Sequence, residues 1–340
     1  MAGLSYDFVF PKLHGIWAES FSVERISHIA AGQDLNVLSR ALTSLGIDID
    51  DRREVQKALF SKLIEQLHQI QHLLDDPLAD FYRGQIERFF FENLKTILHY
   101  RYHQGDDSTL NRVLITGDAL PPLPLQQMLE ARTIHQFYQL LPKHVAKEQI
   151  LPVLVELDDT KDMLVAEGKL DRIFYESLAK TAGDLPRLVR GSAQELVSME
   201  VDVLNIITCL RNIAVYKIPP AKLRPMLLDE GGTLDPPALT RLAAASDEEE
   251  VISKIPSFYR KALQNRESAR LYVQENALWS LIYRRSQRCF RDFNRPALSV
   301  TAFPFLKRFE YLNLSRLFEG LYLQLSPKVI RSMIIGTQDV

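Results

Sequence analysis

One short helical signature occurs three times in this chain and limits the folds that the chain can adopt. The copies read Phe90-Phe91-Glu92-Asn93-Leu94, Asp202-Val203-Leu204-Asn205-Ile206 and Glu310-Tyr311-Leu312-Asn313-Leu314. They lie about 110 residues apart, beyond the roughly 20–50-residue periods of solenoid and propeller repeats. In the second and third copies an acidic residue precedes the Asn by three positions, which on a helix places both side chains on one face. The recurrence therefore predicts three similar helical units.

The composition of the 340-residue chain fits a globular protein of two or three domains, at a prior of roughly 150 residues per domain. With 46% hydrophobic and 25% charged residues, the chain can bury a core and wholesale disorder is not expected. The 41 basic and 43 acidic residues nearly balance, which gives no support to nucleic-acid binding, because that function usually requires a basic domain or stripe. The two cysteines, Cys209 and Cys289, suggest neither a disulfide framework nor a metal site, so a reducing cytosolic setting is expected.

Neither a secretory signal nor a membrane span is expected. A signal peptide has a basic region followed by an apolar region, and the first seven residues of this chain do not begin such a pattern. No window approaches the ~20 apolar residues that cross a bilayer. If the protein works at a membrane, it is predicted to reach it through a partner already there.

The hydrophobic periodicity is helical along most of the chain. Apolar residues recur at intervals of three and four, and no strict alternation flanked by hairpin turns is evident, so we expect an all-α fold without a sheet. Clusters of Gly and Pro punctuate the pattern as loops. The longest helices are predicted over residues 54–74, 78–104, 196–215 and 305–325, with Gly105 placed to end the second of them.

The repeat extends beyond the Asn helix. After the first and second copies the sequence predicts a short helix, a turn and a new capped helix at matching places. Thr133 with Gln136, and Ser246 with Glu249, are spaced as capping boxes. After the third copy the chain ends before such a second half. We expect three units, over residues 1–115, 116–228 and 229–340.

Two histidine pairs are the candidates for metal chemistry. His68 with His72, and His99 with His103, are each four positions apart, a spacing that can hold zinc. No third ligand is evident, and neither pair has the His-Glu-x-x-His arrangement of metalloproteases. Solvated pairs on helix surfaces are therefore the preferred interpretation, and we predict neither a metal nor a cofactor.

The remaining chemical candidates are the two cysteine thiols and two runs of charged residues. Cys209 lies on the apolar face of its helix and is predicted to be a core residue. Cys289 lies within the basic run 284–291, where arginines could activate the thiol, although an incidental thiol is favoured. The run itself could face an acidic partner or anionic lipid, or be a solvated helix face. The acidic run 247–250 begins a predicted helix, where negative charge suits the dipole.

The repeated Asn has two interpretations. Asn is a mediocre residue for a helix interior, so its threefold recurrence predicts that it bonds a neighbouring backbone or side chain within each unit. Alternatively, the faces that carry Asp202 with Asn205 and Glu310 with Asn313 line a surface that meets a partner. Asn93, Asp202, Asn205, Glu310 and Asn313 are therefore the candidate site residues.

Four stretches follow one another in a series that spans nearly the whole chain. They lie at residues 6–15, 92–98, 201–207 and 304–314, and the last is followed by Leu325-Ser326-Pro327-Lys328-Val329-Ile330. In these stretches the chain resembles the C subunit of the V-type (A-type) ATPase/ATP synthase, a family related to the d subunit of the eukaryotic V-ATPase.

The resemblance implies a funnel of three pseudo-symmetric helical bundles without an active site. Such a central-stalk component would cap the membrane rotor ring of proteolipid subunits and hold the foot of the axle, made of D- and F-type subunits, in its socket. It would couple ATP turnover to proton or sodium movement. The implied location is peripheral, on the cytoplasmic face of the membrane, with membrane contact only through the ring.

Two other classes of function fit the residues considered alone. Repeated helical units would also suit an all-α scaffold or adaptor in signalling or trafficking. A helical metal-dependent enzyme would use His68, His72, His99 or His103.

Overall fold

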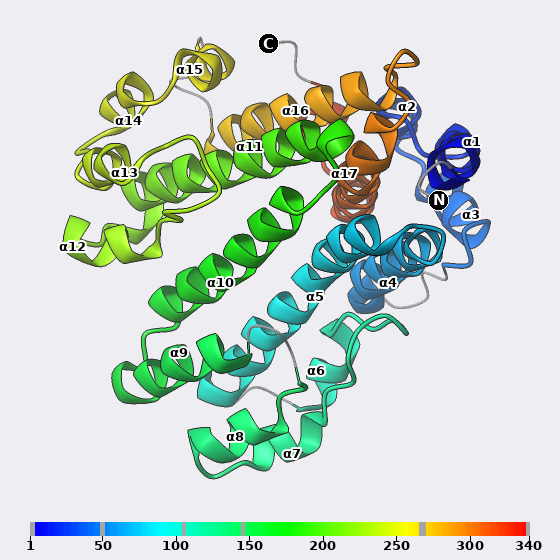
Figure 1. The fold of residues 1–340 in the computed structure, drawn as a ribbon. Coiled ribbons are helices and arrows are strands. Elements are labelled where there is room, and N and C mark those ends of the chain that lie inside the picture. The colour runs from blue at the N-terminus through cyan, green and yellow to red at the C-terminus, as the bar shows by residue number, and fades with distance from the viewer. Residues whose placement is uncertain (1–3, 48–51, 104–106, 144–146, 265–269, 338–340) are drawn as a thin grey trace.

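The computed structural model describes the chain except for residues 1–3, 48–51, 104–106, 144–146, 265–269 and 338–340 (Figure 1). Every regular element in the described part is helical, so the all-α prediction is confirmed. Gly105, the expected end of the second long helix, lies outside the described residues.

The helices vary from single turns to 28 residues. In the first half they are α1 (Leu4–Ala18), α2 (Val23–Gly32), α3 (Leu35–Thr43), α4 (Arg52–Gln71), α5 (Asp76–His103), α6 (Asp107–Val113), α7 (Leu125–Glu130), α8 (Ile134–Leu140) and α9 (Lys147–Thr160). They continue as α10 (Met163–Gly183), α11 (Arg187–Arg211), the π-turn η1 (Asn212–Tyr216), α12 (Pro220–Leu223), the 3-10 turn η2 (Arg224–Met226), α13 (Pro236–Ala243), α14 (Glu248–Lys254), α15 (Ser257–Leu263), α16 (Leu271–Phe290), α17 (Leu298–Tyr322) and α18 (Pro327–Met333).

Six long helices form the centre of the molecule as three consecutive pairs, α4 with α5, α10 with α11, and α16 with α17 (Figure 1). The second helix of each pair carries the signature Asn. Each helix of the six packs on the next in the chain, and α17 packs back on α4, so the six close into a ring. Contacts between α11 and α17 cross this ring. The ring brings the three signature helices together although they lie far apart in sequence.

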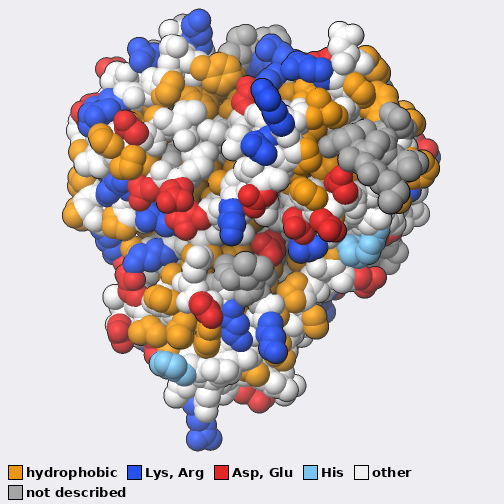
Figure 2. Space-filling model, in the orientation of Figure 1, with side chains coloured by type: hydrophobic (Ala, Val, Ile, Leu, Met, Phe, Trp, Pro, Cys, Tyr) orange, Lys and Arg blue, Asp and Glu red, His pale blue; other side chains and the backbone are white. Residues whose placement is uncertain are grey.

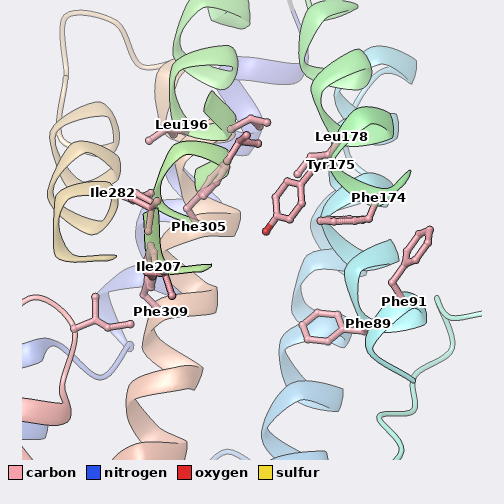
Figure 3. Close-up of a cluster of buried hydrophobic side chains, with 14 of the residues drawn as sticks. Phe89, Phe91, Phe174, Tyr175, Leu178, Leu196, Ile207, Ile282, Phe305 and Phe309 are labelled. Carbon is pink, nitrogen blue, oxygen red and sulfur yellow. The ribbon is translucent and has the colours of Figure 1, made fainter. Parts of the chain in front are cut away.

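Aromatic and aliphatic side chains fill the contacts between the pairs. Figure 3 shows Phe89 and Phe91 of α5 near Phe174 and Tyr175 of α10, while Phe305 of α17 lies close to α11. The Phe91 and Phe174 ring centroids are 5.7 Å apart, a separation typical of favourable aromatic pairs. Apolar burial thus joins neighbouring pairs into one core.

Shorter helices cover the ring. Helices α1, α2 and α3 pack on α17, and α2 also contacts α18, so both ends of the chain gather around the third pair. The predicted succession of a short helix and a capped helix is present twice, as α7–α8 and α13–α14. The capping box of Thr133 and Gln136 is confirmed.

The second predicted capping box was wrong by one residue. Asp247, not Ser246, is the N-cap of α14, and it accepts from the backbone N–H of Glu250 at 2.8 Å. The Glu250 carboxylate accepts in turn from the backbone N–H of Ser246 at 2.7 Å. Asp and Ser are equally favourable N-cap residues, so the sequence alone was compatible with either Ser246 or Asp247 as the N-cap.

The helix bounds also differ from the prediction in an informative way. Helix α17 begins at Leu298, seven residues before the predicted start, and runs through Pro304. Pro lacks the N–H that would bond the carbonyl four residues earlier, which here belongs to Val300. The buried Tyr82 hydroxyl of α5 donates to this carbonyl at 2.8 Å. A side chain from another pair thus replaces the missing helical bond.

Candidate functional site

The three signature Asn side chains make the same pair of hydrogen bonds. Each amide nitrogen donates to the carbonyl, and each amide oxygen accepts from the N–H, of one residue 22 or 23 positions downstream. The partners are Ile115 for Asn93 (2.7 and 2.9 Å), Leu228 for Asn205 (3.0 and 2.8 Å) and Ile335 for Asn313 (2.9 and 2.8 Å). The predicted bonding of the Asn to neighbouring backbone is therefore confirmed in all three copies.

The acidic residue before the second Asn anchors a loop. Asp202 is fully buried and accepts from the backbone N–H groups of Thr233 (2.9 Å) and Leu234 (3.1 Å) and from the Tyr259 hydroxyl (3.0 Å). The loop passes so close that a Cβ on Gly232 would lie 2.5 Å from the Asp202 carboxylate. A bare backbone is therefore needed at that position.

The acidic residue before the third Asn bonds to the start of the chain. Glu310 accepts from the backbone N–H of Phe21 at 2.8 Å and pairs with Lys307 at 2.5 Å. In the first copy the equivalent position holds the buried Phe90. The contacts of these predicted site residues lie within the chain, and a role for them at an interface stays a prediction.

The same helices line a cavity of about 570 Å³, to which Asn93 also contributes. Residues five and one positions before each Asn line it, and because they are four positions apart they share one helix face. All three copies contribute at both positions. The residues five positions before the Asn are Arg88, Glu200 and Arg308, and those one position before it are Glu92, Leu204 and Leu312.

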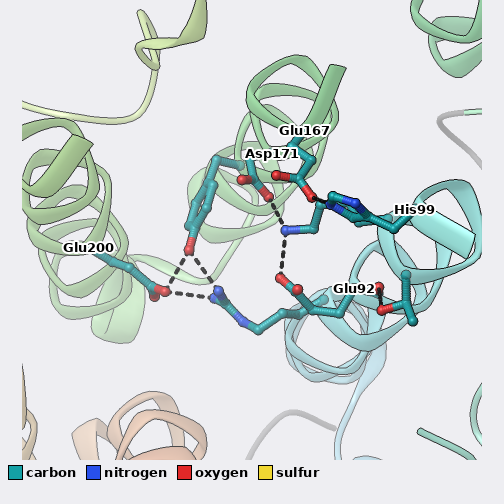
Figure 4. A network of polar contacts seen from close by, with 9 residues as sticks. Glu92, His99, Glu167, Asp171 and Glu200 are labelled. Carbon is teal, nitrogen blue, oxygen red and sulfur yellow. Dashed lines mark hydrogen bonds and ion pairs between the residues drawn. The ribbon is translucent and has the colours of Figure 1, made fainter. Parts of the chain in front are cut away.

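The residues five positions before each Asn meet at this cavity. One oxygen of the buried Glu200 carboxylate lies 2.8 Å from Arg88 Nη2 and 2.6 Å from Arg308 Nη1. The Tyr175 hydroxyl donates to the same oxygen at 2.7 Å and accepts from Arg88 Nη1 at 2.7 Å. Figure 4 shows this contact between α5, α10 and α11. One buried carboxylate thus connects all three signature helices.

The electrostatics of this cluster follow from its burial. Burial alone would raise the pKa of Glu200, but Arg308 and Arg88 outweigh burial and hold it below its usual value. Burial, together with the nearby Arg88 charge, lowers the pKa of Arg308. Burial also raises the pKa of the Tyr175 hydroxyl well above its usual value, which keeps this group a donor.

A second polar chain continues from the cavity along α5 and α10 (Figure 4). Lys95 pairs with Glu92 at 2.8 Å and with Asp171 at 2.9 Å. Farther on, His99 Nε2 lies 2.6 Å from Glu167. These contacts add polar links between the first and second pairs.

The cavity cluster was not among the predicted site residues. Arg88, Glu200 and Arg308 all stand five positions before their Asn, but the second copy has an acid where the first and third have arginine. Aligning the three copies on the Asn and reading the equivalent positions for complementary charge would have found them.

The two histidine pairs lie on separate helices. His68 and His72 face each other with Nε2 atoms 3.0 Å apart on α4, and the His99 and His103 rings stack on α5. Among the residues that the structure describes, no group of three or more His, Cys, Asp or Glu side chains could hold a metal ion.

Cys209 is buried, as predicted for a core residue, and burial raises its pKa to about 12. Cys289 is also buried, and the Ser192 hydroxyl lies 3.4 Å from its sulfur. In the basic run, Arg285 pairs with Glu195 of α11, whereas Arg288 is exposed. Figure 2 shows basic and acidic side chains interspersed across the face it presents.

Comparison with known proteins gives one consistent result. The family model described as "ATP synthase (C/AC39) subunit" matches residues 40–333. The C subunit of the A-type ATP synthase of Methanosarcina mazei is 23% identical over 146 residues, which are 43% of this chain and 39% of that protein. The corresponding protein of Halorubrum lacusprofundi is 26% identical over 174 residues, 50% of this chain and 48% of that protein. The chain thus matches less than half the length of each of these curated relatives.

Proposed function

The chain belongs to the ATP synthase (C/AC39) subunit family, and from this premise we propose that it is the non-catalytic central-stalk component of a V-type (A-type) ATPase. In this role it couples the axle of the soluble ATPase sector to the membrane rotor ring for proton or sodium transport. The axle is formed by D- and F-type subunits. The observation that carries the proposal is the cavity lined by equivalent positions of three repeated helices.

We further propose that residues 1–115, 116–228 and 229–340 act as three quasi-equivalent bundles that form a funnel. The recurring helix pairs and the three identical Asn–backbone contacts support this division. The predicted first and second units end at Ile115 and Leu228, the residues to which Asn93 and Asn205 bond. Asn93 and Asn205 would then each tie the end of a unit to its signature helix.

A protein that couples an axle to a ring must pass force between partners without unfolding. The closed ring of six helices and the buried contact of Glu200 with Arg88 and Arg308 suit this demand, because a load on one signature helix is shared by the other two. No helix in the described part of the chain is long and apolar enough to cross a membrane. We propose a peripheral position on the cytoplasmic face, with the rotor ring supplying the membrane contact.

The test is capture of the axle subunits by this chain. We expect the wild-type chain to retain purified D- and F-type subunits. The double variant Leu204→Trp with Leu312→Trp should lose this capture, because two indole rings would fill the cavity in which we propose that the axle docks. Val37→Trp, at an exposed position on α3, is the control and should bind normally. Circular dichroism and the melting temperature check that each variant is folded. A folded wild-type chain that retains neither axle nor ring would overturn the proposal.

A further inference from the structure

The central cavity is lined by more positive than negative charge. Among the residues that the structure describes, the acidic side chains that line it are Glu92, Asp171 and Glu200. The basic side chains of that part of the chain that line it are Arg88, Lys95, Arg211, Arg308 and Arg316. The charge of the whole chain is almost balanced, but the side chains around the cavity between the three signature helices carry an excess of positive charge.

Two of these cations are well compensated. Lys95 pairs with both Glu92 and Asp171 at 2.8 and 2.9 Å. Arg211 pairs with Glu275 of α16 through Nε at 2.7 Å and through Nη2 at 3.0 Å. The excess of positive charge thus falls on the other three arginines.

One carboxylate, that of Glu200, pairs with two of these three arginines. Arg88 and Arg308 both contact the same oxygen of Glu200. Arg316 lies two turns beyond Arg308 on α17, about 12 Å along the helix axis at 1.5 Å per residue. It donates to uncharged acceptors, the Asn276 amide oxygen and the Met333 carbonyl, both at 2.8 Å. Arg88 and Arg308 therefore share one paired carboxylate and Arg316 bonds neutral acceptors. The charges of Glu92 and Glu275 act on Arg88 and Arg316 from farther away.

Donors of the cluster are left without acceptors. Within the described residues, Arg88 Nε is buried without a hydrogen-bond partner. Arg308 donates to Glu200 through Nη1, and its guanidinium carbon lies 5.2 Å from the centroid of the Phe309 ring. Burial lowers the pKa of Arg316, and burial and the charge of Arg88 lower the pKa of Arg308. Two buried guanidinium groups thus share one paired carboxylate, and buried charge is favourable only where it is well compensated, so an added anion would stabilise this arrangement.

We propose that the cavity is a binding site for an oxyanion, a phosphate or carboxylate group, held by Arg88 and Arg308 with Arg316 as the third cation. Guanidinium forks match the oxygens of these groups in geometry as well as charge. A free anion and an acidic side chain inserted by a protein partner present the same chemistry. The proposal concerns the isolated chain and does not depend on the rotary role.

The experiment is calorimetric titration of the purified full chain with inorganic phosphate and, separately, with a glutamate-rich peptide. Potassium chloride at matched ionic strength corrects for general salt effects. We expect saturable one-to-one binding and a rise of the melting temperature with at least one of the two probes. Binding of phosphate identifies a free-anion site, whereas binding of the peptide alone identifies a site for a partner's acidic side chain.

Substitutions at Arg316 separate the site from the fold. Arg316→Gln should weaken the affinity at least tenfold, and Arg316→Lys, which keeps the charge, should retain most of it. Arg83→Gln is the matched control, because Arg83 is an exposed arginine of α5 paired with Asp80. The melting temperature without probe reports any purely structural effect. Absence of binding to both probes, or equal binding by the Gln variant and wild type, would refute the site whether or not the axle is captured.

Discussion

The Tyr82 hydroxyl donates to the carbonyl of Val300 at 2.8 Å, and this carbonyl is the one that Pro304 leaves without its helical partner. Tyr82 belongs to α5 and Val300 to α17, so the bond connects the first and third helix pairs. Tyr82 is completely buried, and burial raises its pKa well above the usual value. The hydroxyl therefore stays protonated and able to donate.

We expect Tyr82→Phe to lower the free energy of unfolding by about 1–3 kcal/mol, because it leaves a buried carbonyl without a partner. In a Pro304→Ala background the N–H of residue 304 can donate to the carbonyl of Val300, so Tyr82→Phe should lower the free energy of unfolding by less. The measurement is a double-mutant cycle by urea unfolding. Tyr138→Phe, at a partly buried tyrosine, is the control. Equal costs of Tyr82→Phe in both backgrounds would show that the hydroxyl does not replace the missing bond.

The Asn–backbone contacts predict a graded series. Asn205→Ala and Asn313→Ala each leave one backbone N–H and one carbonyl without a hydrogen-bond partner. Because each Asn is only 1% exposed, water cannot replace the lost bonds, and each substitution should lower the free energy of unfolding by about 2–5 kcal/mol. Asn93 is 7% exposed, so water can partly replace its side chain and Asn93→Ala should cost less. Urea midpoints check the order.

Asn294→Ala, at an exposed loop position, is the control for the series and should change stability by no more than about 0.5 kcal/mol. Costs at Asn205 and Asn313 as small as that at Asn294 would rule out a shared stabilising role for the signature Asn.

The hydrophobic periodicity was enough to predict the helical fold, and the recurring Asn was enough to predict a bond to a neighbouring backbone or side chain, because both depend on local sequence. Neither was enough to predict the start of α17. Pro304 indicates a helix boundary when the local chain is considered alone, and only the distant Tyr82 makes the longer helix favourable. Tertiary contacts of this kind have no local pattern.

The charged cavity escaped prediction for a related reason. Arg88, Glu200 and Arg308 stand at equivalent positions, but the second copy carries the opposite charge, so a search for a residue identical in all three copies passes over them. Their complementarity exists only between copies, once the ring has brought the three helices together. The acids at Asp202 and Glu310, although equivalent in sequence, bond to unrelated partners.

Thiol labelling tests the burial of both cysteines. Burial raises the pKa of Cys209 to about 12 from 9.0, which lowers the thiolate fraction near pH 8 roughly a thousandfold, and Cys289 is equally buried. We expect iodoacetamide to modify neither thiol in the native protein within the time that it modifies both in urea. Cys209→Ser and Cys289→Ser variants assign the signals. Rapid labelling of native Cys289 would instead support the activated thiol.

The contact of Glu200 with Arg88 and Arg308 predicts a specific dependence of stability on pH. The folded protein holds the Glu200 pKa below the value of 4.5 expected for the unfolded chain. Its stabilising contribution is therefore complete above about pH 4.5 and is lost as the pH falls through the folded pKa.

We expect Glu200→Gln to cost about 3–5 kcal/mol at pH 7, because two buried guanidinium groups lose their counter-charge. Its urea midpoint should fall less steeply than that of wild type between pH 5 and pH 3, since the titrating carboxylate is absent. Glu249→Gln, an exposed acid of α14, should follow the wild-type slope. Parallel slopes for wild type and Glu200→Gln would mean that Glu200 keeps an ordinary pKa, and that the three signature helices meet without a charge-stabilised contact.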